Sequence, residues 1–173
     1  MSNYKEDLGK IKAFAFDVDG VFSNDKLYLH PSGDMMRTMN IKDGYAIQYA
    51  VRKNYPVCII TGGNSEAVRK RFMGLGVTDI YLKAVYKKDC FDDFIYKYHL
   101  SPSEVLYMGD DLPDYEIMKE VGFPACPADA VEEIKSLSKY ISDRKGGEGC
   151  VRDMIEQVLR FQGKWMGGDA YSW

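Results

Sequence analysis

The sequence predicts an α/β fold, a Rossmann-like parallel sheet with helices on both faces, and two patterns support it. Short, nearly continuous apolar runs alternate with segments of helical periodicity along most of the chain. Strands that are apolar on both faces are typical of a parallel sheet covered by helices on each side. Their alternation with helices indicates βαβ units.

Five apolar runs are the predicted strands. They cover residues 11–16, 57–60, 80–82, 105–108 and 123–126. The first is followed by Asp17, the second by Thr61 and the fourth by Gly109-Asp110-Asp111. The carboxyl ends of parallel strands meet at one edge of a sheet, and ligands of open α/β sheets bind there. We therefore expect these polar residues to lie together.

Helical periodicity fills the intervals between the strands. The predicted helices cover residues 45–54, 65–74, 89–99, 114–121 and 151–161. In the third of them, Phe91, Phe94 and Ile95 share one face, as apolar residues three and four apart do on a helix. The fourth ends before Gly122, a common residue after the last helical turn.

One segment interrupts the alternation. Residues 26–30 and 35–41 are strand-like and flank Pro31-Ser32-Gly33-Asp34, a turn signal, so we predict an inserted β-hairpin over 26–41, after the first strand. An isolated hairpin is marginal in water, and this one carries many apolar side chains. We therefore expect it to pack against another subunit. We expect the aromatic tail at 164–173, with Trp165 and Trp173, to dock on a neighbouring subunit as well.

Composition limits the class of protein. A chain of 173 residues that is 46% hydrophobic with a net charge of -3 predicts one domain over residues 1–173. It is too acidic for non-specific nucleic-acid binding and has no apolar run long enough to span a bilayer. The four cysteines are widely spaced, which favours reduced thiols and a cytoplasmic location over a zinc or disulfide framework. They are Cys58, Cys90, Cys126 and Cys150.

The acidic residues at the expected sheet edge favour a magnesium site. Asp17 and Asp19 follow the first strand, and Asp110, Asp111 and Asp114 follow the fourth. Clustered carboxylates repel one another unless a cation lies among them, and Mg²⁺ prefers oxygen ligands. For Asp114, which opens a predicted helix, a helix N-cap is an equally good interpretation.

Four motifs in order resemble those of the haloacid dehalogenase-like phosphohydrolases. They are Phe16-Asp17-Val18-Asp19-Gly20-Val21, Thr61-Gly62, Lys87 before a helix, and Gly109-Asp110-Asp111-Leu112-Pro113-Asp114. A lone Asp-x-Asp-Gly is a weak signal, whereas four ordered motifs are specific. The resemblance implies that Asp17 is the nucleophile that forms an aspartyl phosphate. It implies that Asp19 protonates the leaving alkoxide and then activates water, which separates phosphatases from dehalogenases.

The resemblance also implies the ligands of the metal and of the phosphoryl group. Asp17, Asp110 and the backbone carbonyl of Asp19 would hold Mg²⁺, and Asp111 and Asp114 would orient that site. The hydroxyl of Thr61 and the ammonium of Lys87 would hold the phosphoryl oxygens. The neighbouring Lys88 is a weaker match in spacing than Lys87.

The short interval between the first two motifs indicates a capless member of this family. It has room for the hairpin and one helix only, so the chain resembles the capless subfamily that forms homotetramers. The best-known members hydrolyse 3-deoxy-D-manno-octulosonate 8-phosphate, a sugar acid phosphate used for the lipopolysaccharide inner core. The segment from Gly146 to Arg152, Gly-Gly-Glu-Gly-Cys-Val-Arg, resembles a C-terminal signature of this subfamily.

The same resemblance implies a substrate site and leaves its specificity open. A substrate loop is expected at 40–44, and the implied substrate-binding residues are Asp19, Asn40, Lys42, Asp43, Gly44, Gly63, Arg71 and Lys87. Many octulosonate phosphatases have arginine at the position of Gly63. Relatives that act on nine-carbon keto-deoxy acid phosphates have glutamate there and a lysine near the position of Gly74. The absence of both charges favours the eight-carbon substrate and keeps the nine-carbon one as the alternative.

Interpretations without phosphatase activity are a receiver domain and a silent interaction protein with the same fold. A receiver domain has paired acids at its first strand and its phosphorylated aspartate at the third, and the inserted hairpin has no counterpart in it. A relative without activity would not need all of the motif residues, and their presence here disfavours that interpretation. A separate partner chain, such as a cytidylyltransferase for sialic-type acids, stays open.

Overall fold

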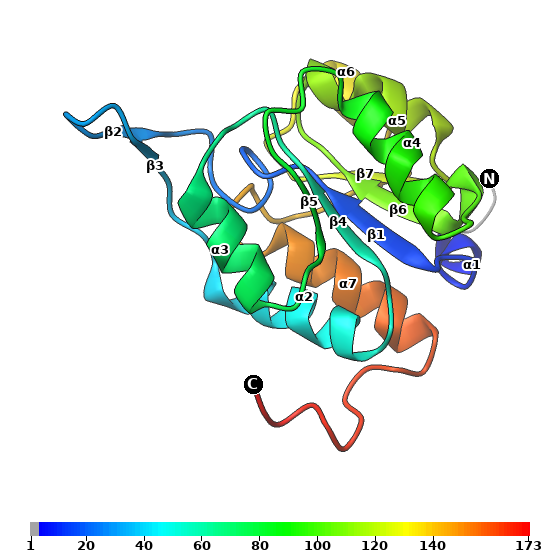
Figure 1. Cartoon of the computed structure of the whole chain (residues 1–173). Helices are drawn as coiled ribbons and strands as arrows, with labels where there is room; N and C mark the ends of the chain where they lie inside the picture. The colour runs from blue at the N-terminus through cyan, green and yellow to red at the C-terminus, as the bar shows by residue number, and fades with distance from the viewer. Residues whose placement is uncertain (1–3) are drawn as a thin grey trace.

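A six-stranded sheet forms the centre of the protein in the computed structural model, which describes residues 4–173 (Figure 1). Its strands are β1 (Ala13–Phe16), β4 (Val57–Ile60), β5 (Asp79–Tyr81), β6 (Val105–Met108), β7 (Phe123–Cys126) and β8 (Tyr140–Ile141). Their spatial order is β5-β4-β1-β6-β7-β8, and each neighbouring pair is parallel. The predicted fold class is confirmed. The prediction of one domain also includes residues 1–3, which lie outside the described residues.

The strands are buried because both of their faces pack on helices. Every residue of β1, β4, β6 and β7 is buried. Successive side chains point to opposite faces, so Phe14 and Phe16 join one apolar cluster while Ala13 and Ala15 join the other. This double burial explains why the strands appear in the sequence as apolar runs without alternation.

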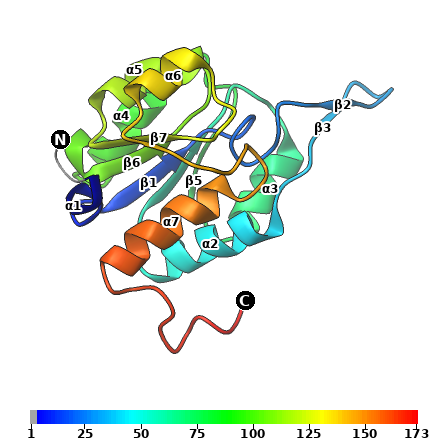
Figure 2. The ribbon, with the colours of Figure 1, turned by 180° about the vertical axis from the view of Figure 1, so that it is seen from behind.

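Two groups of helices cover the two faces of the sheet (Figures 1 and 2). The first group is α2 (Ile41–Arg52), α3 (Glu66–Gly74) and α7 (Cys150–Phe161), and the second is α4 (Lys87–Lys97), α5 (Tyr115–Glu120) and α6 (Glu132–Leu137). Short helical segments complete the described chain: α1 (Tyr4–Leu8), η1 (Pro102–Glu104) and η2 (Leu112–Asp114). Within residues 4–173, no helix combines the length and the apolar character that crossing a membrane requires.

The hairpin projects from the body of the protein (Figure 1) and has a shorter ladder than predicted. Only β2 (Tyr28–Leu29) and β3 (Met35–Met36) pair, and all of these residues are exposed. Helix α2 begins at Ile41 instead of residue 45, because the Asn40 side chain accepts a hydrogen bond from the Lys42 amide and caps it. The predicted substrate loop at 40–44 is therefore the cap and first turn of a helix. Gly44, a weak helix former, concealed this in the sequence.

The short elements α1, α6 and β8 were not predicted, and neither was η1. The helices α1 and α6 have 5 and 6 residues, and β8 has 2, so none is long enough for a clear periodic pattern. They form through tertiary contacts. Ile134 of α6 is fully buried against the sheet, and β8 extends the sheet by pairing with β7.

The tail at 164–173 packs on α2 and α7 of its own chain, and its docking on a neighbouring subunit stays a prediction. The Trp165 ring meets the Tyr49 ring edge-on, with 5.3 Å between centroids. Lys53 pairs with Asp169 at 2.7 Å, and the Tyr45 hydroxyl donates to the carbonyl of Ala170. Aromatic contacts and one ion pair thus hold the tail against the body.

Asp43 connects the two helices that carry this tail. Its side chain is fully buried, and its Oδ1 accepts a hydrogen bond of 2.7 Å from the Arg152 amide in the first turn of α7. The N-cap residue of α7 is Gly149, which has no side chain to cap the helix. Asp43 therefore caps α7 from α2. Burial raises the pKa of the Asp43 carboxyl to about 6.

This raised pKa predicts a pH-dependent effect of Asp43→Asn on stability. Between pH 3.8, the ordinary pKa, and about pH 6, the carboxyl keeps its proton in the folded state and loses it in the unfolded state. The free energy of unfolding of the wild type therefore falls as pH rises through that window. Asparagine does not titrate. From pH 4 to pH 7, the stability of the variant relative to the wild type should rise by about 2 kcal/mol, which is most of the free energy of that pKa shift. Urea unfolding across this range measures it, and a constant difference would contradict the raised pKa.

Candidate active site

Four titratable side chains converge at the carboxyl edge of the sheet beside β1, where the strand order changes direction. Asp17 follows β1, Asp110 follows β6, Asp114 ends η2, and Lys87 is the first residue of α4. One carboxylate oxygen from each aspartate lies within 4.8 Å of the other two. Thr61, at the end of the adjacent β4, is buried at the same edge. The structure thus brings together most of the residues that the four motifs predicted.

Lys87 is the cation of this cluster. Its Nζ lies 2.9 Å from Asp17 Oδ1 and 2.8 Å from Asp114 Oδ1, and its side chain is only 6% exposed. Lys88 points elsewhere, pairing with Asp92 at 2.5 Å and with Glu120 at 3.1 Å. Of the two lysines, Lys87 is therefore the one that lies next to the nucleophile candidate.

Asp114 is the centre of a buried hydrogen-bond network. It is fully buried, and in addition to Lys87 it accepts from the Tyr107 hydroxyl at 2.6 Å and from the Asp110 amide at 3.1 Å. The Asp111 side chain caps η2 instead, accepting from the Leu112 amide at 2.8 Å. The sequence did not indicate Tyr107, because a tyrosine within an apolar strand looks like an ordinary core residue.

Burial and repulsion from Asp114 shift the pKa values of Asp17 and Asp110. Burial and the charge of Asp114 raise the pKa of Asp17 well above its ordinary value, despite Lys87 nearby. The same two causes raise the pKa of Asp110 to about 7. Burial opposes the charge on Lys87, but Asp114 and Asp17 outweigh it and raise the lysine pKa. Closely spaced carboxylates with this shortage of positive charge fit a hard divalent cation such as Mg²⁺.

Gly20 makes this spacing possible. Its φ of +84° is in the left-handed region, and a Cβ there would lie 1.9 Å from Asp110 Oδ2. A side chain at position 20 would therefore strain the backbone and displace the Asp110 carboxylate. The glycine of the Asp-x-Asp-Gly motif is a packing requirement of the cluster.

Asp19 does not join this cluster with its carboxylate. Its Oδ1 lies 2.6 Å from Arg37 Nε and its Oδ2 lies 3.1 Å from Arg37 Nη2. Arg37 comes from the segment between β3 and α2, and it was not predicted. No local pattern marks it, since the two partners are 18 residues apart and the hairpin between them has no chemical motif.

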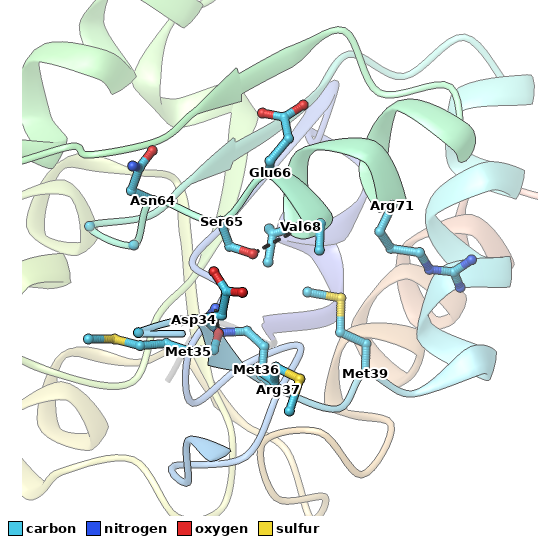
Figure 3. Close-up of a pocket in the computed structure, with 14 residues that line it drawn as sticks. Asp34, Met35, Met36, Arg37, Met39, Asn64, Ser65, Glu66, Val68 and Arg71 are labelled. Carbon is cyan, nitrogen blue, oxygen red and sulfur yellow. Dashed lines mark hydrogen bonds between the residues drawn. The ribbon is translucent and has the colours of Figure 1, made fainter. Parts of the chain in front are cut away.

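A cavity of about 1070 Å³ opens next to this ion pair, between the hairpin and the start of α3. Figure 3 shows Met35, Met36 and Arg37 on the hairpin side of this cavity and Asn64, Ser65 and Glu66 on the α3 side. The cavity adjoins the aspartate cluster through Gly62 and Gly63, which directly follow Thr61.

The predicted substrate residues are distributed between this cavity and the helix ends behind it. Gly63 and Arg71 line the cavity, and the Arg71 side chain extends toward α2 (Figure 3). There a Cβ on Gly44 would lie 2.2 Å from Arg71 Nη2, so this glycine leaves room for the guanidinium. Asn40 caps α2 and donates to the Gly147 carbonyl at 3.3 Å.

The two predicted substrate residues between Asn40 and Gly44 have different environments. Lys42 is exposed to solvent in the first turn of α2. Asp43 is fully buried and is hydrogen-bonded to the start of α7. Asp43 therefore joins two helices in this structure and does not face the cavity.

Comparison with known proteins identifies the family. Residues 71–154 match the family model described as haloacid dehalogenase-like hydrolase. The 3-deoxy-D-manno-octulosonate 8-phosphate phosphatase of Salmonella typhi is 35% identical over 154 residues, which cover 89% of this chain and 82% of that protein. The chain belongs to the haloacid dehalogenase-like hydrolases, and the predicted resemblance is confirmed.

Solved structures of 3-deoxy-D-manno-octulosonate 8-phosphate phosphatases have the same fold as this chain. The phosphatase of that name from Yersinia pestis has a TM-score of 0.92 at 30% identity, covering 96% of this chain and 90% of its own. The one from Moraxella catarrhalis, in complex with magnesium ion, phosphate ion and a KDO molecule, has a TM-score of 0.91 at 30% identity and covers 95% of each chain. The chain is therefore similar to 3-deoxy-D-manno-octulosonate 8-phosphate phosphatases over nearly its whole length.

The position of Asp17 predicts that Asp17→Asn abolishes turnover and preserves the fold. An amide oxygen still accepts from Lys87 and from the Val18 amide, as Asp17 Oδ1 does at 2.9 Å and 2.6 Å. The amide nitrogen is a poor nucleophile, so phosphate release should fall by at least about 10⁴-fold. Circular dichroism should be unchanged. The matched control is Asp92→Asn at an exposed aspartate of α4, and appreciable activity in the Asp17 variant would contradict the assignment.

Proposed function

We propose that the protein is a magnesium-dependent phosphatase that hydrolyses 3-deoxy-D-manno-octulosonate 8-phosphate to the free sugar acid and phosphate. The observation that carries this proposal is the buried cluster of Asp17, Asp110 and Asp114 around Lys87, next to Thr61. The similarity to phosphatases of that name over most of the chain supports the substrate.

The first step transfers the phosphoryl group to the protein. The Asp17 carboxylate attacks phosphorus in line, and the bond between phosphorus and the sugar oxygen breaks. Asp19 gives a proton to the leaving oxygen. The hydroxyl of Thr61 and the ammonium of Lys87 hold the non-bridging oxygens, where negative charge gathers.

The second step regenerates the protein. Asp19, now ionised, takes a proton from water, and this water attacks the phosphorus of the aspartyl phosphate. The bond between phosphorus and Asp17 breaks and phosphate leaves. Asp17, Asp110 and the backbone carbonyl of Asp19 would hold Mg²⁺, with Asp111 and Asp114 orienting the site. When bound, the ion supplies positive charge that neutralises the phosphoryl oxygens.

The cavity beside the cluster receives the sugar acid in this proposal. Arg71 supplies the positive partner that an anionic sugar acid needs, with Gly44 making room for its guanidinium. Gly63 forms the boundary between the cavity and Thr61. Asn40 and Lys42, at the start of α2, complete the proposed substrate side. Burial of Asp43 gives it an indirect role, through the position of α2 and α7.

The hairpin supports the proposal that the protein works as a homotetramer. Leu29 is 77% exposed, and Tyr28, Met35 and Met36 are each more than half exposed. An apolar patch of this kind on a projecting hairpin marks an interaction surface. The four cysteines are free thiols, which fits the proposed cytoplasmic location. The product would enter lipopolysaccharide inner-core synthesis.

A magnesium-dependent phosphate-release assay tests the substrate. The panel contains the eight-carbon acid 8-phosphate, nine-carbon keto-deoxy acid 9-phosphates and simple sugar phosphates. We expect kcat/KM for the eight-carbon substrate to exceed the others by at least about tenfold, which is about 1.4 kcal/mol in transition-state binding. Removal of Mg²⁺ with a chelator should abolish release. Preference for a nine-carbon acid would overturn the substrate and retain the mechanism, and no release from any member would overturn both.

Leu29→Asp tests the assembly. A carboxylate placed in an apolar interface loses its hydration without a partner, so the variant should sediment as smaller species than the wild-type tetramer. Its circular dichroism should be unchanged, because the side chain is exposed in the single chain. The matched control is Tyr96→Asp on α4, where Tyr96 is 80% exposed. A tetrameric Leu29 variant, or equal dissociation of both variants, would contradict the hairpin interface.

A further inference from the structure

The ion pair between Arg37 and Asp19 joins the hairpin to the proposed general acid–base. Arg37 Nε lies 2.6 Å from Asp19 Oδ1, and Arg37 Nη2 lies 3.1 Å from Asp19 Oδ2. The Arg37 side chain is only 7% exposed, whereas that of Asp19 is 39% exposed. A two-point pairing of a guanidinium with a carboxylate fixes orientation as well as distance.

The remaining guanidinium nitrogen is also engaged within the hairpin. Arg37 Nη1 donates to the carbonyl of Met35 in β3 at 2.8 Å. Each of the three guanidinium nitrogens therefore has a protein partner, two on Asp19 and one on the backbone. This arrangement is suited to holding the Asp19 carboxylate in place. It leaves no guanidinium nitrogen of Arg37 without a protein partner, which makes Arg37 less suited to binding a phosphate.

The two oxygens of Asp19 differ in their surroundings. Oδ1 has the short contact with Arg37 and also accepts from the Ser23 hydroxyl at 3.2 Å. Oδ2 has the longer contact with Arg37 and faces the space over Gly63. A Cβ at Gly63 would lie 3.6 Å from that oxygen, 3.4 Å from Thr61 Oγ1 and 3.5 Å from Arg37 Nη2. Oδ2 and the phosphoryl-binding hydroxyl thus border the same small space.

We propose that Arg37 is a positioning residue for the acid–base step, holding Oδ1 of Asp19 so that Oδ2 faces the reacting oxygens. The inference rests on the proposed phosphatase function. The proton that the leaving oxygen receives, and later the proton taken from water, both pass through Oδ2. Arg37 itself gains and loses no proton. Because the pairing comes from the hairpin, the geometry of the acid–base group depends on the segment that replaces a cap domain.

The test compares kcat/KM for substrates with poor and good leaving groups. An alkyl phosphate needs a proton on its leaving oxygen, whereas p-nitrophenolate leaves without one. In Arg37→Ala we expect kcat/KM for the alkyl phosphate to fall by about 10- to 100-fold, as for other positioning partners, and that for p-nitrophenyl phosphate by less than about threefold. Arg37→Lys, which cannot pair at two points, should recover only part of the loss.

The control removes another cation from the same hairpin. Lys26 is exposed and takes no part in the ion pair of Arg37 with Asp19, so Lys26→Ala should change neither value. Equal losses on both substrates in the Arg37 variants would show that Arg37 acts on the phosphoryl group, and unchanged values on both would show that it has no part. Either result overturns the proposal. Circular dichroism and magnesium dependence check that each variant is folded.

A double-mutant cycle separates action through Asp19 from independent action. In an Asp19→Asn background, adding Arg37→Ala should cause no further loss with p-nitrophenyl phosphate or the alkyl phosphate, because the group that Arg37 positions no longer transfers protons. A further loss equal to that in the wild-type background overturns the proposal. Wild-type turnover is measured first, and the alkyl phosphate hydrolysed best is used. If phosphate is released from the other substrates and not from the octulosonate 8-phosphate, the proposed substrate is wrong and the Arg37 test still holds.

Discussion

The placement of one buried lysine between two buried aspartates is the constraint on which the site depends. Removing these charges from water is expensive unless each has close partners, and Lys87 meets Asp17 and Asp114 within 3 Å. The lysine opens α4, and the aspartates follow β1 and β6, so the pairing holds three segments in register. Close approach also determines the local composition. A Cβ on Gly109 would lie 2.4 Å from Asp114 Cγ, which explains a glycine at the end of β6.

The hairpin combines an exposed apolar end with a base that contacts Asp19. Its outer residues are apolar and exposed, which suits contact with other subunits. Its base carries Arg37, which reaches back to Asp19. The same short segment therefore borders the cavity, exposes apolar side chains and pairs with Asp19. A projecting hairpin is only marginally stable by itself. Burial in an assembly would give the hairpin the rigidity that positioning a side chain requires.

The loop before the C-terminal helix α7 supports the backbone that follows β1 at the site. The loop before α7 packs so closely on the backbone after β1 that a Cβ on Gly146 would lie 2.0 Å from the carbonyl oxygen of Gly20. The Gly147 amide donates to the Val21 carbonyl at 2.9 Å. Asp43 then ties the start of α7 to α2. The glycine-rich segment is thus a contact surface for the loop after β1, which begins at Asp17, and substrate contact is not needed to explain it.

The sequence by itself determined the sheet, its helices and the motif residues at its carboxyl edge. Apolar runs and helical periodicity are local patterns, and the ends of parallel strands meet at one edge in any such fold, so Asp17 and Asp110 could be placed together in advance. The family resemblance added Lys87 to them. The tertiary structure alone decided which side chains pair across elements. Asp43 caps a helix that begins more than 100 residues later, at a separation of 109 residues from its partner Arg152. Arg37 reaches Asp19 from a hairpin without a motif, and Tyr107 donates to Asp114 from inside an apolar strand. Such pairings depend on distances of a few ångströms set by packing, and no local pattern in the chain records them.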